Sequence, residues 1–167
     1  MGETTPMPPP VSPPSFDAQP LRRVPDAQAL EALGARIADR VRPGEAVCLW
    51  GPLGAGKSTL ARGLVRALTS PEEEVPSPTF TLVQAYEGRL AAAHFDLYRM
   101  KSPDEAHELG LDEALEVGVA VIEWPQRLEG ALPPDRLDVE IAIPEDGDGR
   151  LVRVRGQGAW ADRDLEF

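Results

Sequence analysis

An eight-residue segment constrains the fold of this chain more than any other feature. Residues 51–58 read Gly-Pro-Leu-Gly-Ala-Gly-Lys-Ser and match G-x-x-x-x-G-K-[ST], a pattern expected by chance roughly 0.001 times in a chain of this composition. The apolar run Ala46–Trp50 precedes the segment and is typical of a buried strand, and the amphipathic stretch 58–68 follows it. A strand, a glycine-rich loop and a helix in this order predict a phosphate-binding loop (P-loop).

The residue types in this loop are those needed to bind the phosphates of a nucleoside triphosphate. Glycines let the chain curl so that backbone N–H groups converge on phosphate oxygens. The Lys57 ammonium can reach the β- and γ-phosphates, and the Ser58 hydroxyl can bind Mg²⁺. The positive end of the following helix points at the same anion. The predicted nucleotide-binding residues are Gly51, Gly54, Ala55, Gly56, Lys57, Ser58 and Thr59.

Two carboxylates end apolar runs further along the chain, where a P-loop protein needs an acid for its Mg²⁺. Asp96 follows the predicted strand 90–95, and Glu123 follows the predicted strand 119–122. Because doubly wound sheets bind ligands at the carboxyl ends of their strands, we predict Asp96 and Glu123 as catalytic residues. Ser58 and Glu123 are the predicted metal ligands, although the sequence leaves open which acid touches the metal directly.

Segment 76–81, between the P-loop and the first acid, combines two prolines with several hydroxyl residues. Switch segments of P-loop proteins occupy this position in sequence and sense the γ-phosphate, so Thr79 could orient water or the metal. A proline-braced start to a strand explains the same residues equally well. We interpret His94 and Cys48, which both lie in predicted strands, as core residues.

The remaining patterns predict an α/β fold, a P-loop NTPase-like three-layer sandwich with a mixed sheet and added β-hairpins. We expect a helix capped by Asp26, a short helix over 103–109 ended by Gly110, and further strands over 80–86, 137–143 and 150–155. Three parts are expected along the chain. They are a disordered, proline-rich N-terminal extension (1–20), a P-loop ATPase domain (21–156) and a C-terminal tail (157–167).

Charge and composition exclude several classes of protein. Lys and Arg number 17 against 28 Asp and Glu, and a chain with a net charge of −11 is a poor autonomous binder of nucleic acid. A single cysteine excludes an internal disulfide. No apolar run approaches the roughly 18 residues of a membrane span, and the first residues lack the pattern of a signal peptide. We therefore expect a cytoplasmic protein with no membrane partner.

Missing signatures narrow the class of P-loop protein. The guanine-specific N-K-x-D motif is absent, which disfavours a GTPase. The L-S-G-G-Q signature of transporter ATPases is absent too. A small P-loop kinase acting on a metabolite or nucleoside stays open, although no arginine cluster stands where its lid would lie. A nucleotide-gated binding module is a further alternative.

Four strings in series resemble one known family. They are G-P-L-G-A-G-K-S-T-L, S-P-T-F-T-L-V, H-F-D-L-Y-R and I-E-W-P, and in this order they are similar to the TsaE (formerly YjeE) family. The resemblance covers roughly residues 24–143. Ser58 stands where many members have Thr, which keeps the hydroxyl, and Pro52 stands where Asp is frequent.

The resemblance implies a bacterial ATPase required for the threonylcarbamoyladenosine modification of the tRNA adenosine beside the anticodon. It implies an enzyme that is weak alone and acts with TsaD and TsaB, the pair that carries out the transfer, so that tRNA is met only through them. Asp96 and Glu123 would serve the metal and the attacking water, with Trp124 as a functionally sensitive neighbour. The adenine would lie near Asp26 and Ala27, and Arg99 is a candidate for aiding hydrolysis.

Overall fold

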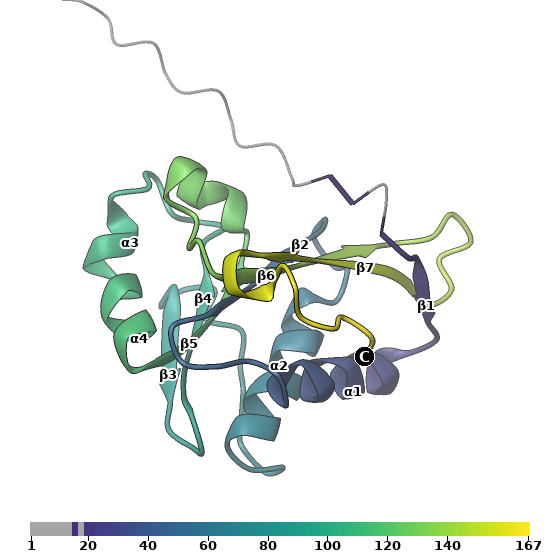
Figure 1. The fold of residues 1–167 in the computed structure, drawn as a ribbon. Coiled ribbons are helices and arrows are strands. Elements are labelled where there is room, and N and C mark those ends of the chain that lie inside the picture. Colours follow the sequence, from purple (N-terminus) through teal and green to yellow (C-terminus); the bar gives the residue numbers. More distant parts are fainter. Residues whose placement is uncertain (1–14, 17–18) are drawn as a thin grey trace, which may run out of the picture.

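A seven-stranded mixed sheet forms the centre of the fold, in the order β1-β7-β6-β2-β5-β4-β3 (Figure 1). The computed structural model describes residues 15–16 and 19–167. The strands are β1 (Arg22–Val24), β2 (Ala46–Trp50), β3 (Val83–Tyr86), β4 (Ala91–Asp96), β5 (Gly118–Glu123), β6 (Arg136–Ala142) and β7 (Arg150–Gln157). The α-helices are α1 (Ala27–Ala38), α2 (Lys57–Leu68), α3 (Glu105–Glu108) and α4 (Leu111–Val117), with 3₁₀-helices η1 (Pro125–Ala131) and η2 (Gly158–Trp160).

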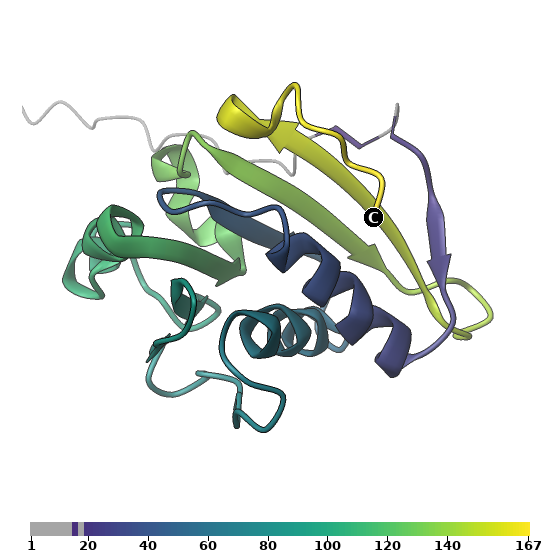
Figure 2. The same ribbon diagram turned by 60° about the horizontal axis from the view of Figure 1, so that its bottom comes forward.

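The sheet lies between two helical layers, which confirms the predicted three-layer α/β architecture. Figure 2 shows α1 and α2 side by side against one face, where their apolar residues pack on side chains such as Val121 and Val139. On the opposite face, α3, α4 and η1 pack against side chains that include Phe95 and Ile122. Buried strands of this kind read as continuous apolar runs because both faces are covered.

The centre of the sheet is parallel and its flanks are antiparallel, as the prediction of a mixed sheet with added hairpins requires. Strands β4, β5, β2 and β6 run parallel to one another. The hairpins β3–β4 and β6–β7 extend the sheet on its two sides, and β1 pairs antiparallel with β7. The four parallel strands therefore end at one common edge of the sheet.

The two helices of the first layer begin close to where the sequence predicts. The Asp26 side chain caps α1 by accepting a hydrogen bond of 2.8 Å from the Ala29 N–H. Helix α2 begins at Lys57, directly after Gly56 in the left-handed conformation. The two helices pack closely, because a Cβ on Gly63 would lie 2.0 Å from the Glu31 carbonyl oxygen.

The strand predicted over 80–86 begins only at Val83, so the first part of that prediction is wrong. Leu82 has a φ of 66°, and its N–H bonds the Pro78 carbonyl at 2.7 Å. A turn therefore occupies 78–82 and leaves Phe80 82% exposed. Positive φ at a leucine is rare, and no propensity pattern signals it.

The helix predicted over 103–109 is also shorter than expected, because α3 covers only Glu105–Glu108. The Glu105 carboxylate accepts the Lys101 N–H at 3.1 Å instead of closing a capping box with Ser102. Gly110 ends this helix with φ 82°, as predicted, and the same residue precedes α4, which the sequence reading missed.

The segments outside the expected 21–156 domain are described only in part. Residues 1–14 and 17–18 of the expected N-terminal extension lie outside the described residues, whereas Phe16 is buried against the second helical layer. The 157–167 segment packs on the body of the protein, and Trp160 within it is fully buried. Among the described residues, no helix has the length and apolar character needed to cross a membrane.

Candidate active site

The carboxyl edge of the parallel sheet gathers the predicted P-loop and both predicted acids. Strand β2 runs directly into Gly51, while β5 ends at Glu123 and β4 ends at Asp96. The strands lie in the order β2-β5-β4, with Leu49 paired to Glu123 and Glu123 paired to Asp96. Sheet register therefore places the two carboxylates beside each other and next to the loop, as a doubly wound sheet does for its ligands.

The loop has a positive φ at Gly51, Gly54 and Gly56, and at two of these a Cβ would also clash with a neighbour. Gly56 has φ 110°, and a Cβ there would lie 2.5 Å from Leu30 Cδ2. Gly51 has φ 153°, and a Cβ there would lie 2.4 Å from the Ile141 carbonyl oxygen. Helix α2 follows with no side-chain cap at its N-terminus, so its first N–H groups face the loop. This cradle fits a phosphate group.

Lys57 is 4% exposed and lies between the loop and an aromatic ring. Its Nζ donates to the Gly51 carbonyl at 2.5 Å and to the Pro52 carbonyl at 3.3 Å, and lies 3.6 Å from the centre of the Trp124 ring. Burial lowers the pKa of Lys57, and the charges of Glu123 and Asp96 oppose that shift. The ammonium therefore balances the two carboxylates at the centre of the site.

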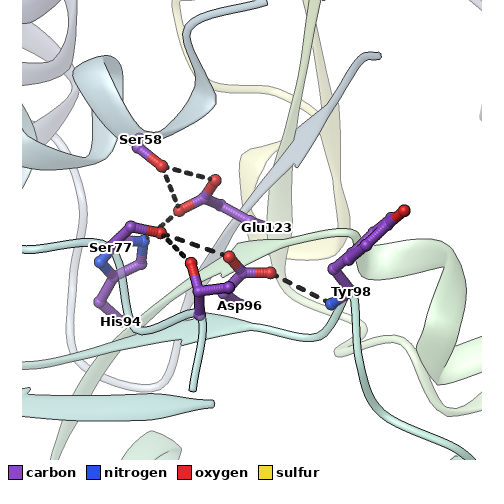
Figure 3. A network of polar contacts seen from close by, with 7 residues as sticks. Ser58, Ser77, His94, Asp96, Tyr98 and Glu123 are labelled. Atoms are coloured by element: carbon purple, nitrogen blue, oxygen red, sulfur yellow. Dashed lines mark hydrogen bonds and ion pairs between the residues drawn. The ribbon is translucent and has the colours of Figure 1, made fainter. Parts of the chain in front are cut away.

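Ser58, Glu123 and His94 form one connected group (Figure 3). The Ser58 hydroxyl lies 3.0 and 3.1 Å from the two oxygens of Glu123, and His94 Nε2 lies 2.6 Å from Glu123 Oε2. Glu123 is 3% exposed and His94 is fully buried. The carboxylate stands in the middle of this group, so the histidine is not placed to activate the serine as a nucleophile.

Asp96 belongs to a second set of contacts at the same edge. Its Oδ1 accepts the Tyr98 N–H at 3.1 Å, and the Ser77 hydroxyl lies 3.4 Å from its Oδ2 (Figure 3). Ser77 also lies 3.0 Å from the Thr79 hydroxyl. The hydroxyl segment 76–81 therefore reaches the second acid. The role of Thr79 stays a prediction.

Two adjoining pockets flank the P-loop. The first, of about 480 Å³, is lined by Lys57, Ser58, Asp96, Arg99, Glu123 and Trp124 among others. The second, of about 230 Å³, is lined by Asp26, Ala27, Gly149 and Arg150, and the two pockets share Gly54, Gly56 and Thr59. The loop residues thus stand between a pocket rich in charged groups and one at the start of α1.

Sequence reasoning missed two residues of this region. Arg150, at the start of β7, donates to the Ala55 carbonyl at 2.9 Å and to the Gly54 carbonyl at 3.3 Å, and so fastens the hairpin to the P-loop. His94 was interpreted as a core residue, which is correct for its burial and omits its contact with Glu123. The one signal available in the sequence was that His94 lies two residues before Asp96, which puts both side chains on one face of β4.

The residues present fit a nucleotide-bound Mg²⁺ better than an independent metal centre. In the described part of the chain, no group of three or more His, Cys, Asp or Glu side chains could hold a metal ion. Mg²⁺ is commonly held by one or two protein oxygens together with substrate phosphates and water. Ser58 and Glu123 offer such oxygens beside the phosphate cradle. These residues therefore suit the binding of a nucleoside triphosphate together with its Mg²⁺.

Comparison with known proteins connects this site to one family. The family model described as "Threonylcarbamoyl adenosine biosynthesis protein TsaE" matches residues 24–152. A Bacillus subtilis protein named tRNA threonylcarbamoyladenosine biosynthesis protein TsaE is 38% identical over 132 residues, 78% of this chain and 82% of that protein. A Rickettsia felis protein of the same name is 36% identical over 112 residues, 66% of each, so the alignment spans slightly less than two thirds of that relative.

The crystal structure of Bacillus subtilis YdiB has the same fold. It superposes with a TM-score of 0.70 at 29% sequence identity, covering 86% of this chain and 89% of that one. The P-loop NTPase type of the sandwich, predicted from the glycine loop, is confirmed by this likeness together with the mixed sheet.

Proposed function

This chain belongs to the TsaE family, which takes part in tRNA threonylcarbamoyladenosine biosynthesis, and we propose that it is an Mg²⁺-dependent ATPase of that pathway. The observation that carries the proposal is the convergence of the P-loop, Ser58 and Glu123 at the end of one parallel sheet. This is the arrangement with which P-loop enzymes hold a triphosphate and its metal.

Each part of the site has a role in this proposal. Backbone N–H groups of 54–59 bind the phosphates, and Lys57 leaves the Gly51 carbonyl to meet the β- and γ-phosphate oxygens. Ser58 and Glu123 hold Mg²⁺, which when bound neutralises phosphate charge and orders the β- and γ-oxygens. The second pocket, at Asp26 and Ala27, takes the nucleoside end of ATP.

The two acids divide the work according to their contacts. Glu123 bonds the Ser58 hydroxyl, so it is the acid on the metal side. Asp96 contacts Ser77 and the Tyr98 N–H and lies on the far side of Glu123 from the P-loop strand, so it orients the attacking water. Proton transfer through a positioned carboxylate is a common way to activate such a water.

Partner proteins complete the proposal. A chain with a net charge of −11 is unlike a protein that captures tRNA by itself, so we assign tRNA contact to TsaD and TsaB, acting in the cytoplasm. Leu53, which lines the first pocket, and Phe80, whose ring lies under the Arg99 guanidinium, are 73% and 82% exposed and suit contact with another protein. P-loop enzymes that lack a well-placed arginine hydrolyse slowly until a partner completes the site.

A phosphate-release assay tests the proposal. The purified chain with ATP and Mg²⁺ is expected to release phosphate slowly. Addition of TsaD and TsaB is expected to raise this rate. The Lys57→Ala variant should show neither the slow release nor the increase. With ATP labelled in its γ-phosphate, transfer of label to a metabolite or nucleoside instead of water identifies a kinase. Partner assembly that needs nucleotide but is unaffected by loss of hydrolysis identifies a binding module.

A further inference from the structure

His94 is a buried polar residue that contacts a proposed metal ligand. Its side chain is 1% exposed, and its Nε2 lies 2.6 Å from Oε2 of Glu123, whose side chain is 4% exposed. Among the described residues, His94 Nδ1 has no hydrogen-bond partner. The polar interaction of the ring is therefore directed at Glu123.

We infer that His94 is a positioning residue that orients the Glu123 carboxylate for Mg²⁺, an inference that rests on the ATPase function proposed above. The Nε2–H donates to Oε2 and fixes the carboxylate rotamer at the end of β5. Outer-shell hydrogen bonds to a ligating carboxylate hold it in the geometry the metal requires. His94 acts through Glu123 and contacts neither substrate nor metal.

Sheet register explains how this contact arises. In the β4–β5 ladder His94 pairs with Val121, and Asp96 pairs with Glu123. His94 and Asp96 are two residues apart and so project from the same face of β4. Both lie on the side of β5 away from the P-loop strand, His94 beside Val121 and Asp96 at the strand end, so β4 supplies both a support for the metal ligand and the second acid.

A core histidine of purely structural use does not account for these contacts. Histidine in an apolar core costs desolvation, and an apolar residue of similar volume packs there without that cost. Within 4.0 Å of Glu123, the described residues supply no Lys or Arg, so His94 is the basic side chain paired with this buried carboxylate. Ser58, its other side-chain partner, is needed for the metal. When Ser58 turns to the metal, His94 is the side chain that still holds the Glu123 carboxylate in place.

The test compares two substitutions of His94 with one of His107, the exposed histidine of α3. His94→Leu removes the donor, His94→Gln keeps an N–H near the position of Nε2, and His107→Gln is the matched control. Calorimetry measures ATP affinity with saturating Mg²⁺ and with a chelator, and thermal unfolding reports the fold. We expect His94→Leu to reduce the gain in ATP affinity from Mg²⁺ by about tenfold or more, with chelator-measured affinity unchanged. His94→Gln should retain most of that gain.

Other outcomes overturn the inference. An unchanged Mg²⁺ gain in His94→Leu, or an equal loss of ATP affinity with and without Mg²⁺, assigns His94 to packing alone. If His94→Leu does not fold, His94→Gln and NMR of the wild-type ring decide, and a ring that lacks a proton on Nε2 rejects the contact. Failure of the proposed function is distinct, because then the wild type itself shows no Mg²⁺-dependent ATP binding.

Discussion

At the scale of single residues, charge compensation at the P-loop depends on Lys57. The chain has only two lysines, and Lys57 is the buried one, held by loop carbonyls and the Trp124 ring. No other described cation lines the first pocket except Arg99, whose guanidinium lies over the Phe80 ring. Loss of the Lys57 ammonium would leave the phosphate charge without a close partner.

Lys57→Ala is therefore expected to weaken ATP binding by about 10- to 100-fold, the usual value of a hydrogen bond to a charged group. Calorimetric titration of ATP with Mg²⁺ measures the change. Lys101→Ala, which removes the other, exposed lysine, should bind ATP like the wild type. A dissociation constant for Lys57→Ala within twofold of the wild type would contradict the phosphate-binding role of the loop.

Glu123→Gln separates binding from turnover. The amide keeps the shape of the side chain and removes the negative charge that faces Ser58 and the proposed Mg²⁺ position. ATP hydrolysis should fall by about 100-fold or more, as when a preorganised electrostatic group is lost, with a smaller loss of ATP affinity. Phosphate release and calorimetry are measured on the same samples, with the exposed Glu116→Gln as the control. Equal losses in both would assign Glu123 to binding alone.

At the residue level, a sequence pattern can point to site residues where the chemistry is local. The P-loop is one contiguous segment, so its pattern alone predicts Lys57 and Ser58 as phosphate and metal residues. The contact of His94 with Glu123 joins residues 29 positions apart, and that of Arg150 with Ala55 joins residues 95 apart. Both depend on strand register, which no short pattern encodes.

At the scale of elements, the turn from β2 into α2 shapes the site. Gly56 combines a positive φ with close packing on Leu30, so a side chain there is strained by both the backbone and its neighbour. This turn fixes where α2 begins and hence where the N–H groups at the N-terminus of α2 point. Distortion at this residue would spread to the whole phosphate cradle.

Gly56→Ala is expected to lower the free energy of unfolding by about 1–3 kcal/mol and to weaken ATP binding in the same variant. Denaturant unfolding and calorimetry give the two quantities. Gly130→Ala is the matched control, because its Cβ would meet nothing within 4 Å and its φ is not positive. Normal ATP affinity in Gly56→Ala would show that the cradle does not need this conformation.

Elements were predictable where burial on both sides gives an uninterrupted apolar run. The predicted bounds of β2 match the observed ones, and those of β4 and β5 differ by one residue at each end. The start of β3 was misplaced because Leu82 turns the chain with a positive φ, and α4 was missed because it follows α3 directly through Gly110. Such backbone choices depend on tertiary packing, which overrides local propensity.

At the scale of the whole molecule, the carboxyl and amino ends of the parallel strands form two edges of the sheet with different roles. The carboxyl edge holds the candidate active site, whereas the amino edge is closed by the segment after β7. There Trp160 is fully buried, and Arg163 stacks on its ring and binds both oxygens of Glu45, at 2.8 and 2.7 Å. Arg136, at the start of β6, pairs with Gln157, which places this segment away from the P-loop.

This separation predicts that stability and ATP binding can be changed independently. Trp160→Ala should lower the free energy of unfolding by about 3–5 kcal/mol, the cost of emptying a large buried site, and leave ATP affinity unchanged in the folded protein. Denaturant unfolding and calorimetry below the transition measure the two. Exposed Asp162→Ala, in the same segment, should change neither.

The double variant Lys57→Ala/Trp160→Ala tests whether the P-loop and the C-terminal segment are independent of each other. Because the two residues lie at opposite edges and share no contact partner in the described structure, their effects on each quantity should add. ATP affinity would then follow Lys57→Ala and stability would follow Trp160→Ala, with unfolding measured in the absence of ATP so that bound nucleotide does not add stability. A clear departure from additivity would mean that the C-terminal segment is coupled through the sheet to the P-loop.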